Sequence, residues 1–234
     1  MNSGAEPPNR GRLWKVAFFA VVVRPLVLIG LGLNVVGRRR LPAEGPAVLA
    51  ANHNSHLDTV VLMSLFPLSR IQRVRAAGAA DYFFASPTRA WFSRNLFGTI
   101  PMDRSGERSI EAVFEPLLAA LDAGEIVILF PEGSRGEPEQ LGRVRKGIHH
   151  LLRQRPDVPV VPVAMHGLGQ ALPRGEALFV PFNCDVIIGE PMFVTGKAST
   201  FTAELTERLR ALLKRCLTRT ADSSTPNDPK PNGD

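Results

Sequence analysis

Cysteine is scarce in this chain of 234 residues, which holds only Cys184 and Cys216. Two thiols cannot build the disulfide framework of a small secreted domain. They also do not form the C-x-x-C pair that marks many metal sites. The sequence therefore predicts a protein of a reducing compartment.

An uninterrupted apolar stretch is also lacking, and a bilayer span needs about 20 apolar residues. Residues 13–36 come closest, but Arg24 and Pro25 lie in the middle of them. A central charge costs roughly 2.5–3.5 kcal/mol on insertion scales, and proline frees a backbone carbonyl. We therefore expect two short helices that lie in one leaflet or dip into it, with Arg38–Arg40 at the lipid headgroups.

Other interpretations of residues 13–36 are weaker. A signal peptide is disfavoured because the apolar region is long and no small-residue cleavage site follows it. A plain buried hairpin remains the alternative to membrane contact. The chain then divides into a polar N-terminus (1–12), a membrane-associating helical segment (13–40), one folded domain (41–220) and a disordered tail rich in Ser, Asp, Asn and Pro (221–234).

Acidic residues are too few to balance the basic ones: 22 Asp and Glu face 28 Lys and Arg, which gives a net charge of +6. This pattern suits phosphate-bearing partners or an anionic membrane surface. Ordinary solvated arginines would give the same count, so the charge alone does not decide. The basic residues cluster at Arg38–Arg40, at Arg70, Arg73 and Arg75, and at Arg143, Arg145 and Lys146.

Short apolar runs alternate with helical patterns along most of the chain, and no internal repeat interrupts them. This alternation predicts an α/β fold: a layered domain with a largely parallel mixed sheet flanked by helices. Polar residues follow three of the predicted strands, at His53, at Asp103-Arg104 and at Glu132-Gly133. Because ligand-handling residues of such sheets gather at strand ends, we expect these three to meet at one crevice. Strands are predicted at 47–52, 74–79, 98–102, 125–130, 159–165 and 184–189, and helices at 55–66, 81–97, 108–123, 147–154 and 201–217.

Two of the five histidines fall in one stretch of eight residues, NHNSHLDT at 52–59. His53 and Asp58 are five apart, which on a continuous helix would turn them about 140° away from each other. A strand-turn-helix path lets them meet, with Ser55 as the N-cap and Asp58 in the capping-box position. A helix start also favours an ionised Asp58. The carboxylate would then hold one imidazole nitrogen and leave the other free as a base.

Two other interpretations of this stretch stay open. Asp58 could simply cap backbone amides while His53 makes an ordinary hydrogen bond. A metal site is disfavoured: binuclear zinc hydrolases carry H-x-H-x-D-H, whereas residues 53–59 offer H-x-x-H-x-D-T and no ligand cluster elsewhere compensates.

Three further blocks bear on this choice. In order and spacing, the four blocks resemble the motifs of the glycerolipid acyltransferases, most closely the bacterial 1-acyl-sn-glycerol-3-phosphate (lysophosphatidic acid) acyltransferases. The resemblance runs from about residue 41 to residue 191, and RKGIHHL (145–151) resembles the lysine-glycine helix start of that family. The blocks are NHNSHLD (52–58), GTIPMDR (98–104), FPEGSRG (130–136) and VVPVAMHG (160–167).

The resemblance implies a role for each matching residue. His53 would be the general base, with Asp58 as its partner. Backbone amides at the helix start after His53 are candidate donors to the oxyanion. The second and third motifs imply binding of the acceptor and its phosphate by Gly98, Arg104, Glu132, Gly133 and Arg135, and the fourth associates Pro162 with the acyl donor.

The resemblance implies transfer of a fatty acyl group from acyl-CoA or acyl carrier protein to a lysophospholipid, giving phosphatidic acid from 1-acyl-sn-glycerol 3-phosphate. We expect no metal, no cofactor beyond the acyl co-substrate, and no nucleic-acid partner. The expected place is the cytoplasmic face of the inner membrane, as a peripheral or monotopic protein. Alternative acceptors are a lyso-aminolipid or glycerol 3-phosphate. Alternative classes are a non-catalytic lipid-binding module and a metal hydrolase.

Overall fold

The structure, a computed structural model, describes residues 9–55, 57–80, 85–103, 109–134, 136, 140–171 and 183–218. Several predicted features lie outside these ranges: His56, Arg104, Arg135 and residues 221–234.

A mixed sheet forms the centre of the described chain, with seven strands in the order β1-β7-β6-β2-β5-β3-β4. The pairs β2–β5, β2–β6, β3–β5 and β3–β4 are parallel. The pair β6–β7 is antiparallel and β1 runs parallel to β7, so β1 and β7, at one end of the sheet, run opposite to the other strands. The predicted α/β fold with a largely parallel mixed sheet is confirmed. The strands are β1 (Gly32–Val36), β2 (Ala47–Ala51), β3 (Val74–Ala79), β4 (Ile100–Met102), β5 (Ile126–Leu129), β6 (Val160–His166) and β7 (Asn183–Ile188).

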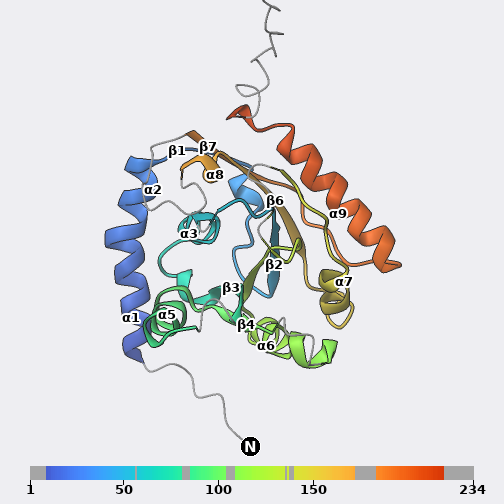
Figure 1. The fold of residues 1–234 in the computed structure, drawn as a ribbon, viewed down its shortest axis with the longest axis horizontal. Helices are drawn as coiled ribbons and strands as arrows, with labels where there is room; N and C mark the ends of the chain where they lie inside the picture. Colours follow the sequence, from blue (N-terminus) through green and yellow to red (C-terminus); the bar gives the residue numbers. More distant parts are fainter. Residues whose placement is uncertain are drawn as a thin grey trace, which may run out of the picture.

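Helices cover both faces of the sheet (Figure 1). Every residue of β2 is buried, and its side chains alternate between two cores. Leu49 joins the core under α1, α2 and α3, whereas Val48 and Ala50 join the core under α6, α7 and α9. A strand buried on both faces reads as a continuous apolar run, which is why the sequence predicts it well. The helices are α1 (Asn9–Phe18), α2 (Arg24–Gly30), α3 (Leu57–Ser64), α5 (Pro87–Phe92), α6 (Ile110–Asp122), α7 (Gly147–Leu152), α8 (Leu168–Ala171) and α9 (Ala198–Leu213), with shorter turns η1 (Phe19–Val23), η2 (Arg38–Arg40), η3 (Ile71–Arg73) and η4 (Ser93–Phe97).

The N-terminal segment differs from its prediction in two ways. Two separate short helices were expected, but α1, η1 and α2 form one helical run from residue 9 to residue 30. Pro25 lies in the first turn of α2, where proline fits a helix well, and the π-helical turn η1 leads into it. The helical prediction for residues 13–40 is wrong at Gly32–Val36, which form β1 and pair with β7. None of the helices in the described ranges is long and apolar enough to cross a bilayer.

The N-terminal helical run has one buried face and one exposed face. Phe19, Val23 and Val27 recur at a helical spacing and enter the core against the sheet. The opposite face keeps Val21 74% and Ile29 86% exposed. The run is therefore not a buried hairpin, since one of its apolar faces is exposed within the described chain.

A buried lysine also fixes α1 to the domain. The ammonium of Lys15 donates to the backbone oxygen of Val74 at 2.8 Å and to that of Phe97 at 3.4 Å. Burial, together with the neighbouring charge of Arg75, lowers the pKa of Lys15 to about 7, although Glu125 acts in the opposite direction. Near neutral pH this lysine is thus poised between its charged and its neutral form.

We predict that Lys15 makes the free energy of unfolding depend on pH in the alkaline range. Between pH 7 and 10 the unfolded lysine keeps its proton while the folded one loses it. The free energy of unfolding should therefore rise with pH across this window, by up to about 1.4 kcal/mol per pH unit. Urea unfolding at pH 7, 8 and 9 should show this rise in the natural protein and not in Lys15→Met. Lys15→Arg, which stays charged, should lack the rise and be the least stable of the three. Parallel curves for natural protein and Lys15→Met would contradict the assignment.

Candidate active site

The turn between β2 and α3 brings His53 and Asp58 together. The Nδ1 atom of His53 lies 2.8 Å from Oδ2 of Asp58. The same carboxylate oxygen accepts the backbone N–H of Asn54 at 2.6 Å and that of Ser55 at 2.8 Å. Asp58 therefore makes its half of the predicted capping box and holds His53 at the same time, whereas the Ser55 hydroxyl accepts the backbone N–H of Leu57 at 3.3 Å. Because Nδ1 is occupied, Nε2 is the ring nitrogen left for a substrate.

The surroundings of Asp58 act on its charge in opposite directions. Its side chain is fully buried, and this loss of hydration raises the pKa of the carboxyl group above its ordinary value. The bonds from His53, Ser55 and Asn54 lower the pKa and offset part of the rise. The net direction is upward, because burial outweighs these bonds. Among the described residues, the other oxygen of Asp58 has no hydrogen-bond partner.

Two asparagines on either side of His53 hold the turn against the end of β6. Asn52 accepts the backbone N–H of Met165 at 2.7 Å and donates to the backbone oxygen of Met165 at 2.8 Å. Asn54 donates to the same oxygen, also at 2.8 Å. Buried side-chain amides thus continue the β2–β6 pairing beyond the strand, and they fix the backbone from which His53 projects.

Glu132, just after β5, joins the His53 turn to a later loop. Its Oε1 accepts the backbone N–H of His53 at 2.9 Å, and its Oε2 accepts the backbone N–H of Gly142 at 2.8 Å. Its backbone oxygen accepts Nε of Arg145 at 2.8 Å. Burial raises the pKa of the Glu132 carboxyl group, and the negative charge of Asp58 adds to this effect, while the two backbone bonds oppose it.

A cavity of about 1000 Å³ opens beside His53. The imidazole stacks on the ring of Phe130, with ring centroids 4.0 Å apart and planes 15° from parallel. Its lining combines polar side chains, such as those of His53, Thr59 and Arg89, with apolar side chains from α3, β3, α5, η4 and α6. Lining residues from the three predicted strand ends include His53, Asp103 and Gly133, so these ends do meet at one crevice.

Comparison with known proteins decides the family. Residues 32–166, more than half of the chain, match the sequence profile of the family described as Acyltransferase. The chain belongs to the acyltransferase family.

Individual acyltransferases agree with this assignment. The chain is 31% identical over 162 residues to the chloroplastic 1-acyl-sn-glycerol-3-phosphate acyltransferase of Arabidopsis thaliana, covering 68% of this chain and 43% of that protein. It is 29% identical over 187 residues to the 1-acyl-sn-glycerol-3-phosphate acyltransferase of Pseudomonas aeruginosa, covering 79% of this chain and 68% of that protein. The chain thus spans less than half the length of the plant protein.

A solved structure shares the fold. The crystal structure of the 1-acyl-sn-glycerophosphate acyltransferase from Thermotoga maritima superposes with a TM-score of 0.69 at 18% identity, and the match covers 92% of this chain and 85% of that one. The layered sheet described above is therefore an acyltransferase fold.

Not every residue that the acyltransferase motifs predict lies at the cavity. Gly133 lines it, and its φ of 82° is one that glycine adopts easily. Gly98 also has positive φ, at 60°, but only its neighbours Phe97 and Thr99 line the cavity. Pro162 is buried within β6 opposite Ala50, away from the residues that line the cavity. Roles for Gly98 and Pro162 in substrate binding stay predictions, as do those of Arg104 and Arg135 outside the described ranges.

Some expectations from the motifs need correction or extension. The backbone amides of Asn54 and Ser55 were candidate oxyanion donors, but both already donate to Asp58. Both carboxylate oxygens of Glu132 accept backbone amides, and its role in acceptor binding stays a prediction. The sequence analysis did not single out Phe130, although it lies in the FPEGSRG motif. Within the described ranges, no group of three or more His, Cys, Asp or Glu side chains could hold a metal ion.

Proposed function

We propose that this protein transfers a fatty acyl group from a thioester donor to the free hydroxyl of 1-acyl-sn-glycerol 3-phosphate, forming phosphatidic acid. The observation that carries the proposal is the His53–Asp58 pair at 2.8 Å beside a largely apolar cavity. A general base next to an apolar cavity is the arrangement that acyl transfer to a lipid hydroxyl requires. The names of the relatives support the choice of acceptor.

The reaction follows from the tautomer that Asp58 selects. Nδ1–H of His53 donates to the carboxylate, so Nε2 carries a lone pair and takes the proton of the acceptor hydroxyl. The hydroxyl oxygen then attacks the thioester carbonyl, and the carbon–sulfur bond breaks. The thiolate leaves with the proton that His53 had taken. Asp58 stabilises the imidazolium between these two steps.

The acceptor and the donor meet at His53 in this proposal. Arg104 and Arg135 would hold the acceptor phosphate as forked guanidinium donors, as the motifs imply. The cavity, of about 1000 Å³ and lined mostly by apolar surface, has the volume for an acyl chain. The donor is acyl-CoA or acyl carrier protein, and no further cofactor takes part.

The experiment for this proposal is a direct assay of acyl transfer. The protein, in membranes or lipid vesicles, is given labelled acyl-CoA or acyl carrier protein and a panel of acceptors: 1-acyl-sn-glycerol 3-phosphate, a lyso-aminolipid and glycerol 3-phosphate. We expect labelled phosphatidic acid as the main product. Transfer only to another member of the panel would replace the acceptor, and lipid binding without transfer to any acceptor would overturn the enzyme assignment.

We also propose that the exposed face of the N-terminal helical run contacts the cytoplasmic face of the inner membrane. This face carries large apolar side chains that a water-exposed helix rarely keeps in such number. An apolar helix face of this kind can lie in the interface plane of one leaflet. The exposed residues on it are Leu13, Trp14, Val21, Val22, Leu26 and Ile29.

We predict that Val21→Gln/Ile29→Gln weakens binding to anionic vesicles at least tenfold, because each side chain withdrawn from the apolar phase costs roughly 1.5–3 kcal/mol. Flotation with vesicles measures this. Point substitutions suit the test better than deletion, since the same run also contributes Phe19 and Val23 to the core. The matched control, Ile110→Gln/Phe193→Gln, removes two exposed apolar side chains elsewhere and should bind like the natural protein. Equal losses in both variants would contradict a specific membrane face.

A further inference from the structure

A second cavity, of about 1210 Å³, lies between residues 140–146 and α9. We call it the basic cavity. Among the described residues, four cationic side chains and two carboxylates line it, which leaves an excess of two positive charges. The cations are Arg143, Arg145, Lys146 and Arg210, and the carboxylates are Glu132 and Glu207.

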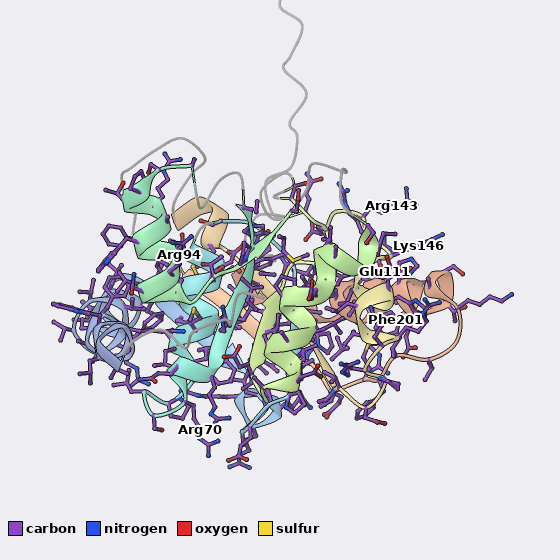
Figure 2. All side chains as sticks on the ribbon, turned by 90° about the horizontal axis from the view of Figure 1, so that it is seen from below. Arg70, Arg94, Glu111, Arg143, Lys146 and Phe201 are labelled. Atoms are coloured by element: carbon purple, nitrogen blue, oxygen red, sulfur yellow. The ribbon has the colours of Figure 1, made fainter. Side chains whose placement is uncertain are left out.

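The carboxylates of the basic cavity already have partners. Glu132 accepts two backbone amides, as described above, and Glu207 is paired with Arg210 at 2.7 Å. Neither ion-pairs with Arg143 or Lys146, and both of these side chains are exposed. Figure 2 shows the two at one end of the molecule, while Arg70 lies at a different edge. The positive charge of the basic cavity is therefore available to an anionic ligand.

The basic cavity is next to the cavity of His53, because Ser134 and Arg145 line both. Arg143 and Lys146 line only the basic cavity. A ligand that occupies both would place an apolar chain and a reactive carbonyl beside His53 and its anionic groups at Arg143 and Lys146. Such a ligand carries its phosphates on a different part of the molecule from its reactive carbonyl, with an uncharged connection between them.

Of the two proposed substrates, the acyl-CoA donor fits the description of a ligand that occupies both cavities, and the lysophosphatidate acceptor does not. In the lysophosphatidate acceptor, the reacting hydroxyl and the phosphate sit on neighbouring carbons, so its phosphate must bind close to His53. In an acyl-CoA, the whole pantetheine arm separates the thioester from the diphosphate and the 3′-phosphate. The cationic side chains that line this open cavity can contact the clustered phosphates of a nucleotide.

We propose that the basic cavity binds the nucleotide phosphates of an acyl-CoA donor, with Arg143 and Lys146 as the phosphate-binding side chains. The inference rests on the proposed function for the identity of the ligand. Arg143 supplies a planar fork and Lys146 a mobile point charge, and both types bind phosphate oxygens through charge-assisted hydrogen bonds.

The test compares two double variants, each of which removes one arginine charge and one lysine charge. Arg143→Gln/Lys146→Gln alters the basic cavity, whereas Arg153→Gln/Lys214→Gln removes one exposed arginine and one exposed lysine outside both cavities. Titration calorimetry with free CoA should show at least tenfold weaker binding for the first variant and unchanged binding for the control. Added salt should weaken CoA binding to the natural protein more than to the first variant.

Kinetics supply the second readout. The first variant should raise the KM for acyl-CoA at least tenfold, with kcat and the KM for lysophosphatidate little changed. Acyl-pantetheine, which lacks all phosphates, should be an equally poor acyl donor for the natural protein and for the variant. A rise in the KM for lysophosphatidate alone would overturn the proposal in favour of an acceptor site. If the first variant lost only transfer from acyl carrier protein, the basic cavity would bind a protein partner instead. If it lost only binding to vesicles, the partner would be a membrane.

Calorimetry needs no turnover, so the two proposals can fail separately. If CoA binding depends on Arg143 and Lys146 but no acceptor is acylated, the proposed function fails and the nucleotide site stands. If acyl transfer proceeds and CoA binds the first variant as tightly as the natural protein, only the nucleotide site fails.

Discussion

Replacing His53 by alanine should lower the rate of acyl transfer by about 10²–10⁴-fold, the usual contribution of a general base. Asp58→Ala should cause a loss of similar size, because Asp58 fixes the tautomer of His53 and stabilises its imidazolium. The double variant should be little worse than either single one, since residues that act as a unit are not additive. Initial rates at saturating acceptor and donor measure all three.

The Asp58→Asn variant separates catalysis from capping. Asparagine can still accept the backbone amides of Asn54 and Ser55, so a residue that only caps the helix should tolerate the change. A partner of the base should not, because the negative charge opposite the imidazolium is lost. We expect Asp58→Asn to fold, as thermal unfolding can check, and to lose most of its activity. If Asp58→Asn kept activity near that of the natural protein, Asp58 would only cap the helix.

His56 and a chelator separate the base from a metal site. If His53 acts through Asp58 alone, His56→Ala should keep substantial activity and a chelator should have no effect. If the stretch binds a metal, both histidines should be essential and the chelator should abolish transfer. Retained activity in His53→Ala would rule out the proposed mechanism altogether.

The sequence predicts most of the central sheet because its strands are short and buried on both faces. The segment IVIL of β5 has apolar, mostly β-branched residues at every position and can hardly be anything else in an α/β pattern. The strand β1, whose residues are exposed or half-buried, was missed. Val35 and Val36 end a longer apolar stretch, and in such a stretch a strand and a helix have the same appearance in the sequence. Only pairing with β7, far along the chain, decides between them.

The contact between His53 and Asp58 was predictable because it is local. His53 and Asp58 are five residues apart, and one strand-turn-helix step brings them together. The contact between His53 and Glu132 spans 79 residues and ends on a backbone amide. Every non-proline residue has such an amide, so no side-chain pattern in the sequence marks the partner. The buried Lys15 escaped notice likewise, since both of its acceptors are backbone carbonyls.

These contacts predict that Glu132 positions the base rather than binding the acceptor. In Glu132→Gln, one side-chain oxygen becomes a donating amide, so the backbone N–H of either His53 or Gly142 would face another donor. A lost hydrogen bond to a charged group costs about 1.5–3 kcal/mol. If the cost falls on the turn that carries His53, kcat should drop roughly 10–100-fold. Steady-state rates with donor and acceptor each varied would show the drop in kcat.

A substitution at Gly142 can displace the Glu132 carboxylate without changing Glu132 itself. A Cβ atom built on Gly142 would lie 2.5 Å from Oε2 of Glu132, too close for the carboxylate to keep its place. Gly142→Ala should therefore reproduce much of the loss of kcat while leaving Glu132 itself intact. The matched control is Gly136→Ala, whose Cβ would meet the same oxygen at an ordinary 3.5 Å. We expect this control to keep nearly full activity.

The division between KM and kcat separates positioning from acceptor binding. A Glu132 that contacts the acceptor directly should, when changed to glutamine, raise the KM for lysophosphatidate and leave kcat near its natural value. A positioning Glu132 should lower kcat for every acceptor alike, because the misplaced group is the base. Gly142→Ala should then follow the same pattern, since it moves the carboxylate away from the backbone N–H of His53. A selective rise in KM in both variants would return Glu132 to the acceptor site and leave the His53 turn to be held by Asn52 and Asn54 alone.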